Sequence, residues 1–140
     1  MSKSSNRFIP FQEVHNIAFG KSRNSIRELL SGSYKEFKRN KFADNATDYY
    51  ESLNLFVEYD AENMCAAVEL TQGAVISILG KKLFKMSYSS VLDFFKQISI
   101  NFNEDSYGVT FFDLGFGIFK TEGLDEVQTV IAFSDSYWEE

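Results

Sequence analysis

One segment of the chain returns in altered form 65 positions further along. Residues 19–30 read FGKSRNSIRELL and residues 84–95 read FKMSYSSVLDFF, and apolar stretches that suit a strand hairpin follow each copy. A Ser at this place is a common helix N-cap, and apolar residues three and four apart mark one helical face. The pattern predicts two tandem repeats of a helix followed by strands, at about residues 17–70 and 82–133. Chance similarity between two amphipathic helices is the alternative.

The pattern within each repeat predicts where its elements lie. In the first repeat we expect a helix at 23–31 ended by Gly32, an edge strand or loop at 34–40, a polar connection at 43–48, and strands at 53–59 and 64–70. After an apolar stretch at 75–79 and a break at 80–82, Ser87 caps a second helix. A polar connection at 101–108 then leads to strands at 109–113, 115–120 and 126–133.

These elements predict one α+β domain over residues 1–140. We expect an antiparallel sheet of about seven strands with two helices packed on one face, and residues 8–11 as an extended leader. The chain has 44% hydrophobic residues, among them 15 Phe, which is enough for one core without a metal or disulfide.

The formal charge of −6 disfavours nucleic acid as a partner, because phosphate contacts need clustered Lys and Arg. A basic protein partner is easier to accommodate, although the same charge also serves solubility. No apolar run approaches the ~20 residues of a transmembrane helix, and the N-terminus does not read as a secretory signal. The expected location is the cytoplasm, without membrane contact.

Few residues suit catalysis or metal binding. His15 is the only histidine, and the only cysteine, Cys65, lies in an apolar strand where its thiol is expected to be protonated and inaccessible. Gly115 and Gly117 fit a strand that makes room for a neighbouring Phe better than a phosphate loop. We therefore expect a protein that is not an enzyme and has neither metal nor cofactor.

Acidic and aromatic residues gather at the predicted loops and turns of both repeats. An acidic rim would speed encounter with a basic partner, and Tyr and Trp are favoured at interfaces. The alternative is that the tyrosines cover the sheet or pack beside the helices. The predicted partner-binding residues are Asp48, Tyr49, Tyr50, Glu51, Glu58, Asp60, Glu62, Asp105, Tyr107, Asp113, Tyr137 and Trp138.

The segment Phe19-Gly20-Lys21-Ser22, followed by Ile26 and Leu29-Leu30, resembles the opening of the helix-turn-sheet repeat in β-lactamase inhibitor protein-like domains. The resemblance covers about residues 17–133. The second copy differs in having Lys85 where the first has Gly20, and the family's Pro-bearing turn after the first helix is not evident. The resemblance implies protein binding through a concave sheet.

Size, charge and architecture are also similar to those of bacterial toxin immunity proteins, including those of contact-dependent inhibition. The leading hypothesis is a protein that neutralises a cognate toxin, such as a basic nuclease, by occluding its active site or functional surface. A sensor or carrier that holds a small apolar ligand between helices and sheet is the alternative, and an enzyme using Glu58, Asp60 or Asp113 comes third. The oligomeric state and the binding face stay open at this point.

Overall fold

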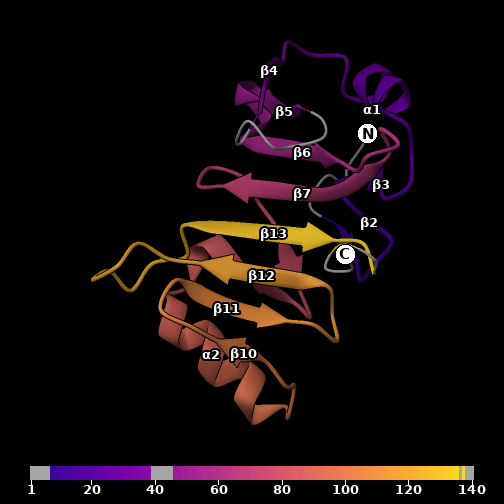
Figure 1. The fold of residues 1–140 in the computed structure, drawn as a ribbon. Coiled ribbons are helices and arrows are strands. Elements are labelled where there is room, and N and C mark those ends of the chain that lie inside the picture. The colour runs from indigo at the N-terminus through magenta and orange to yellow at the C-terminus, as the bar shows by residue number, and fades with distance from the viewer. Residues whose placement is uncertain (1–6, 39–45, 136, 138–140) are drawn as a thin grey trace.

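An eight-stranded antiparallel sheet forms the centre of the molecule (Figure 1). The structure is a computed structural model, and it describes residues 7–38, 46–135 and 137. The strands of this sheet, from one edge to the other, are β10 (Asn103–Glu104), β11 (Gly108–Phe111), β12 (Phe116–Phe119), β13 (Thr129–Phe133), β7 (Cys65–Thr71), β6 (Leu55–Tyr59), β5 (Thr47–Tyr50) and β4 (Lys35–Phe37).

Two α-helices and two small sheets complete the described part of the chain. The helices are α1 (Arg23–Leu30) and α2 (Tyr88–Gln97), and short 3-10 turns lie at η1 (Glu51–Leu53) and η2 (Leu83–Lys85). The small sheets are β1 (Phe8–Ile9), β2 (Glu13–Val14) and β3 (Ile17–Ala18), and the hairpin of β8 (Ser77–Ile78) and β9 (Lys81–Lys82). The predicted α+β class with an antiparallel sheet is confirmed.

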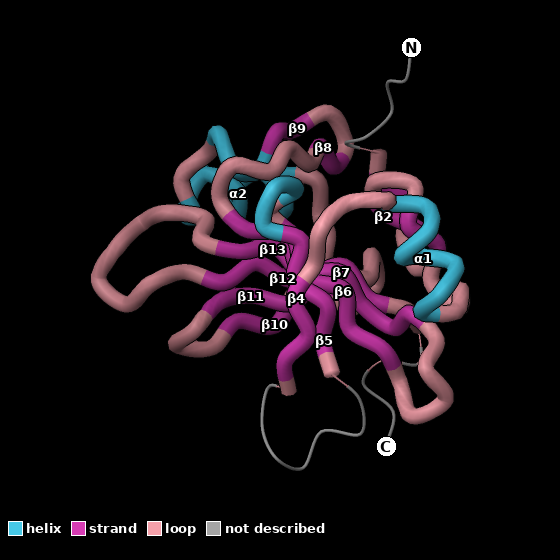
Figure 2. Tube along the Cα trace, turned by 90° about the horizontal axis from the view of Figure 1, so that it is seen from above, coloured by secondary structure: helices cyan, strands magenta, loops and turns pink. Residues whose placement is uncertain are grey.

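The chain visits the large sheet in two runs of four strands. The first run, β4 to β7, follows α1, and the second, β10 to β13, follows α2. The last strands of the two runs, β7 and β13, pair antiparallel at the middle of the sheet. Figure 2 shows α2 and the β8–β9 hairpin on one side of strands β10–β13, with α1 beside β6 and β7.

Both helices begin in the same way, as the recurring serines predicted. The Ser22 hydroxyl accepts a hydrogen bond from the Ser25 amide at 3.2 Å, and the Ser87 hydroxyl accepts one from the Ser90 amide at 3.2 Å. Each capping serine also forms a single antiparallel β-bridge with a residue that precedes a central strand. Ser22 pairs with Met64, just before β7, and Ser87 pairs with Glu126, before β13. Ser31, and not the expected Gly32, takes the left-handed conformation that ends α1.

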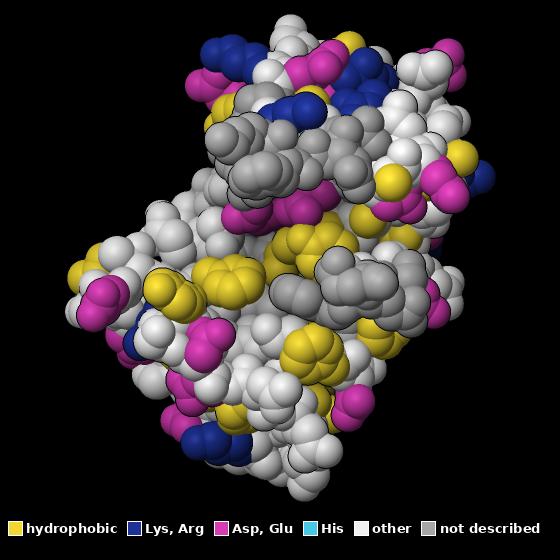
Figure 3. Space-filling model, in the orientation of Figure 1, with side chains coloured by type: hydrophobic (Ala, Val, Ile, Leu, Met, Phe, Trp, Pro, Cys, Tyr) yellow, Lys and Arg dark blue, Asp and Glu magenta, His cyan; other side chains and the backbone are white. Residues whose placement is uncertain are grey.

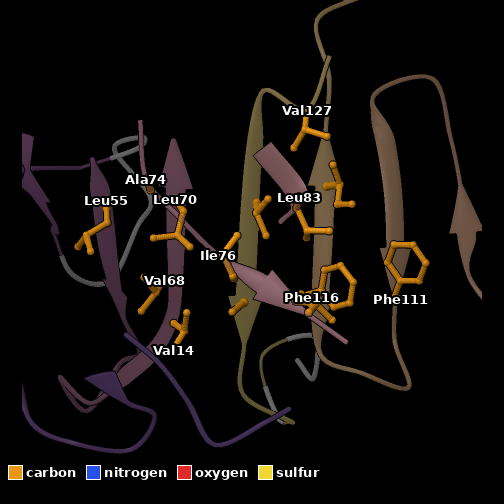
Figure 4. Close-up of a cluster of buried hydrophobic side chains, with 14 of the residues drawn as sticks. Val14, Leu55, Val68, Leu70, Ala74, Ile76, Leu83, Phe111, Phe116 and Val127 are labelled. Carbon is orange, nitrogen blue, oxygen red and sulfur yellow. The ribbon is translucent and has the colours of Figure 1, made fainter. Parts of the chain in front are cut away.

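One face of the sheet packs into the main hydrophobic core. Side chains that lie opposite each other on neighbouring strands pack together in this core. Leu55 is opposite Leu70, for example, and Leu70 is opposite Val130. Ile26 of α1 and Val91 and Phe95 of α2 belong to the same cluster. Figure 4 shows Leu55, Val68 and Leu70 in one part of this core and Phe111 and Phe116 in another, with Ile76 and Leu83 between them.

Several predicted boundaries were wrong where elements are short. Residues 43–48 were expected as a connection, but Thr47 and Asp48 belong to β5. Leu53 lies in η1 and is 39% exposed, so that β6 begins two residues later than predicted. The expected break at 80–82 contains β9, and the short β2, β3 and β10 were missed. Strands of two residues are too short to display an alternating pattern.

Gly115 makes room for the ring of a Phe, as expected, but it lies in a turn and not in the predicted strand. Its φ is +75°, and a Cβ atom there would lie 2.9 Å from the ring of Phe11. Glycine is the residue that adopts this φ without strain, so that backbone conformation and close packing both favour it at the β11–β12 turn.

Candidate protein-binding face

The second face of the sheet is only partly covered. The strand register places Phe56 opposite Glu69, Glu69 opposite Ile131 and Ile131 opposite Gly117, all on this face. Glu58, Glu69, Thr129 and Phe119 are half-buried, whereas the neighbouring positions that face the core are buried. Side chains on this face are therefore partly exposed over β6, β7, β13 and β12. We call it the outer face.

An open groove of about 430 Å³ crosses the outer face. Figure 3 shows this side of the molecule, where acidic and hydrophobic side chains gather over the middle strands. The groove is lined by Glu58, Glu69, Tyr107, Phe119, Lys120, Thr129, Ile131 and Tyr137. We call it the outer groove.

Tyr137 contacts one carboxylate of the outer groove. Its hydroxyl donates a hydrogen bond of 2.7 Å to Oε1 of Glu58. Its ring stacks on that of Phe133, with centroids 5.7 Å apart and planes 20° apart. A hydrogen bond to an ionised carboxylate is stronger than a neutral one, so Tyr137 orients Glu58 on the outer face.

The second carboxylate of the outer groove comes from the neighbouring strand. Glu58 lies opposite Ala67, and Glu69 is two residues beyond Ala67 on β7, so that Glu58 and Glu69 occupy diagonal positions. Diagonal partners on an antiparallel pair have Cα atoms roughly 7–8 Å apart, within reach of long side chains. Two carboxylates thus line one groove from adjacent strands.

Among the described residues that line the outer groove, Lys120 is the cation. Its Nζ lies 5.0 Å from the ring centroid of Tyr88, the first residue of α2. This places the ammonium group over an aromatic ring on the helix, an attractive arrangement for a cation.

A stacked aromatic pair extends the outer face beyond the groove. The rings of Tyr49 and Phe56 have centroids 4.4 Å apart and planes 22° apart. Phe56 is opposite Glu69, so that this pair lies beside the outer groove on β5 and β6. Aromatic side chains of this kind are common anchors in protein interfaces.

The structure brings together some of the predicted binding residues. Glu58, Tyr107 and Tyr137 line the outer groove, and Tyr49 lies on the same face. Tyr107 is 72% exposed. Trp138 lies outside the residues that the structure describes.

Other predicted acids lie in turns. Oδ1 of Asp60 accepts hydrogen bonds from the amides of Glu62 (2.9 Å) and Met64 (3.0 Å), and Oδ1 of Asp105 accepts from those of Tyr107 (2.8 Å) and Gly108 (3.1 Å). These two aspartates shape hairpin turns. Glu51 is exposed in η1, Glu62 is exposed in the β6–β7 turn, and Asp113 lies between β11 and β12 beside a smaller pocket of about 210 Å³.

Two predicted residues do not belong to an exposed rim. Asp48 and Tyr50 are both 0% exposed. Asp48 accepts hydrogen bonds from Nε and Nη2 of Arg27, each 2.8 Å long, and from Nη1 of Arg23 at 3.1 Å. This burial was not predicted, because β5 was not expected and its positions facing the core were therefore not recognised.

The buried Asp48 is the centre of a cluster that joins α1 to the sheet. Arg23 lies over the ring of Tyr59 at 4.2 Å, and Arg27 lies over the ring of Tyr34 at 4.3 Å. Hydrogen bonds to Asp48 raise the pKa of Arg27, and burial followed by the charge of Asp48 raises the pKa of Tyr59. The hydrogen bonds of both arginines to Asp48 hold the helix in place. We call this group the α1 arginine cluster.

His15 and Cys65 have structural surroundings. Nε2 of His15 lies 2.7 Å from the carbonyl oxygen of Val75, and burial lowers the pKa of this histidine. Cys65 is buried, as predicted, and burial raises its pKa to about 12. A thiol with this pKa is protonated at neutral pH and is a poor nucleophile.

Across residues 7–38, 46–135 and 137, no three His, Cys, Asp or Glu side chains are placed to hold a metal ion together. Neither helix in that part of the chain is long and apolar enough to span a membrane.

Comparisons of the chain with protein-family models, curated proteins and solved structures found no match. Sequence reasoning missed several groove residues, namely Glu69, Phe119, Lys120, Thr129 and Ile131. A usable signal was present for Glu69, because it interrupts the apolar pair Val68 and Leu70 and so marks the outward position on its strand.

Proposed function

We propose that this chain is a non-catalytic protein-binding inhibitor whose partner docks on the outer face of the sheet. The observation that carries the proposal is the outer groove, where Glu58 and Glu69 lie among aromatic and aliphatic side chains. In its most specific form the proposal is an immunity protein. It would act in the cytoplasm and neutralise a cognate bacterial toxin by occluding the toxin's active site or functional surface.

Charge and composition support a basic protein as the partner. The chain has a formal charge of −6, and both carboxylates of the groove add negative charge at the middle of the docking face. Opposite potentials on two proteins accelerate their encounter and disfavour like-charged competitors. The nearby rings of Tyr49, Phe56 and Phe119 supply the aromatic contact area that interfaces favour.

The proposal includes two finer features of the scaffold, namely tandem repeats and helices gathered on one face. Both helices have a Ser cap bridged to the turn before β7 or β13, and each helix precedes four consecutive strands of the sheet. The buried side chains of both helices join one hydrophobic cluster. These observations support a duplicated unit whose helices leave the opposite face available to a partner.

A small-ligand carrier is less well supported. Between α2 and the sheet, the ring of Phe95 lies 4.6 Å from that of Phe111 and 5.8 Å from that of Phe116, measured between centroids. These rings occupy space that an apolar ligand between helix and sheet would need. The abundance of Phe is thus accounted for by core packing, and the protein-binding proposal is preferred.

Co-expression with the product of the adjacent gene tests the proposed function. We expect a stoichiometric complex in native mass spectrometry and protection of cells that express that product. Glu69→Lys on the outer face should abolish both, whereas Asp93→Lys, at an exposed position of α2, should leave both intact. Circular dichroism of the two variants checks that they fold alike. Absence of both complex and protection with the unchanged chain would overturn the toxin-specific proposal.

A further inference from the structure

We propose that the outer groove receives an arginine side chain of the partner protein. The guanidinium group would lie between the carboxylates of Glu58 and Glu69, against the aromatic rings that line the same groove. This inference rests on the proposed function for the nature of the partner, and adds the chemical group that the groove recognises.

The arrangement of the carboxylates suits a guanidinium group. Glu58 and Glu69 come from adjacent strands, occupy diagonal positions and both line the groove. A guanidinium group carries five N–H donors in a planar fork and can donate to two carboxylates at once. A lysine ammonium is a compact point charge and does not offer this planar geometry.

Ring surfaces favour the same ligand. Phe119 from β12, Tyr107 from the β10–β11 connection and Tyr137 line the groove, and the 7% exposed Ile131 lies at its base. An arginine stacks its flat group on such rings and packs its methylene stem on apolar surface. A groove with both carboxylates and rings therefore complements both parts of the arginine side chain.

The protein itself holds two arginines with the same combination of groups. In the α1 arginine cluster, Arg23 and Arg27 both donate to Asp48, and each lies over a tyrosine ring, at 4.2 and 4.3 Å. The outer groove presents carboxylates and rings on the opposite face of the sheet. Charge complementarity and this internal example identify the occupant as an arginine.

Tyr137 acts as a positioning residue for the proposed arginine. Its hydroxyl donates to Oε1 of Glu58 at 2.7 Å, and its ring is held by stacking on Phe133. Loss of the hydroxyl alone would leave the ring in place and release one constraint on Glu58. The two residues should therefore act as a unit, which a double-mutant cycle detects.

A titration of the full-length chain with small probes tests the inference. The probes are N-acetyl-arginine-N-methylamide and its neutral analogue N-acetyl-citrulline-N-methylamide, followed by backbone amide NMR. The arginine probe should give saturable shifts at Glu58, Glu69, Phe119 and Ile131. Glu58→Gln and Glu69→Gln should each weaken its binding by roughly two- to fivefold, as expected for a partly exposed ion pair.

Matched variants and probes make the result specific. Asp93→Asn on α2 should leave the affinity unchanged, and Tyr137→Phe should weaken binding in the unchanged chain but not in Glu58→Gln. Equal binding of the citrulline or the corresponding lysine probe would overturn the inference. Shifts spread evenly over acidic turns such as those of Asp60 and Asp105 would also overturn it, because they indicate a general counter-ion effect.

The outcome is separable from that of the proposed function. If the arginine probe binds in the groove and the adjacent gene product is not bound, the immunity function fails and the arginine site stands. If the product is bound through the outer face and the probe does not bind, the docking face stands and the arginine inference fails.

Discussion

The fully buried carboxylate of Asp48 depends on the two arginines that reach it from α1. Arg27 donates through two nitrogens and Arg23 through one, and the side chains of these arginines are 20% and 9% exposed. Removing a charge from water is expensive, and only good geometry with several hydrogen bonds offsets that penalty. The α1 arginine cluster therefore holds the helix in one place and makes it sensitive to loss of a single charge.

Replacement of that carboxylate tests the α1 arginine cluster. Asp48→Asn keeps the volume but removes the buried anion that Arg23 and Arg27 share, and we expect a loss of about 3 kcal/mol in the free energy of unfolding. Removing one partner of a buried ion pair usually costs about 3–5 kcal/mol, and we expect the lower value because Arg27 is partly exposed. Glu36→Gln is the control, since Glu36 is a half-exposed partner of the same Arg27 and should contribute less than about 1 kcal/mol. Urea unfolding measures both, and equal losses would contradict the argument.

His15 should make the fold less stable in mild acid. Burial lowers its pKa, so that between the folded-state pKa and the unfolded value of 6.5 the unfolded chain binds more protons. Stability is then retained above pH 6.5 and falls as pH drops below it, by at most about 1.4 kcal/mol per pH unit for one proton. Urea unfolding at pH 7.5 and 5.5 measures this. Glutamine has no group that titrates between these pH values. In the His15→Gln variant, the free energy of unfolding should therefore differ less between pH 7.5 and pH 5.5. The same difference in the variant and the unchanged chain would exclude His15 as its origin.

Individual elements were predictable where several residues carried the same signal. The two helices were located correctly because a capping Ser and an apolar stripe coincide at each, and β6 because Leu55, Val57 and Tyr59 alternate with Phe56 and Glu58. Strand β5 was missed because Thr47, Asp48 and Tyr50 are all buried, and a charged residue, Asp48, occupies a position that faces the core. Only pairing with Arg23 and Arg27 makes such burial acceptable, and that contact is not visible in a local pattern.

The two helix caps should contribute unequally although their geometry is alike. We expect Ser22→Ala to lower the free energy of unfolding by about 1 kcal/mol. The loss for Ser87→Ala should be smaller, because Asp125 also accepts from the Ser89 amide near the start of α2, at 2.9 Å. Those hydrogen bonds from Ser89 lower the pKa of Asp125. Chemical denaturation measures the losses, Ser→Asp at each cap should restore stability, and a larger loss at Ser87 would contradict this account.

At the scale of the whole molecule, the candidate site depends on strand order. The outer groove combines Glu58 of β6, Glu69 of β7, Ile131 of β13 and Phe119 of β12, which become neighbours only because β7 pairs with β13. The sequence indicated Glu58, Tyr107 and Tyr137 by residue type. It could not show that they share a groove, because long-range strand pairing is not encoded in a local period. The pairing of β7 with β13 also joins the two runs of four strands into one sheet. The groove and the continuous sheet therefore depend on the same strand pair.

Because β7 pairs with β13, we expect α1 with strands β4–β7 to unfold together with α2 and strands β10–β13. Leu70 of β7 is 0% exposed and lies between Leu55 and Val130, one from each run of strands. Leu70→Ala should lower the free energy of unfolding by about 2–5 kcal/mol through lost contacts and a cavity. Hydrogen exchange should show the same loss of protection in α1 and α2, because both helices join the core cluster that contains Leu70. Leu29→Ala, at a 52% exposed position of α1, is the control and should change stability by less than about 0.5 kcal/mol. Loss of protection confined to α1 and its strands would show two separately folding units in place of one domain.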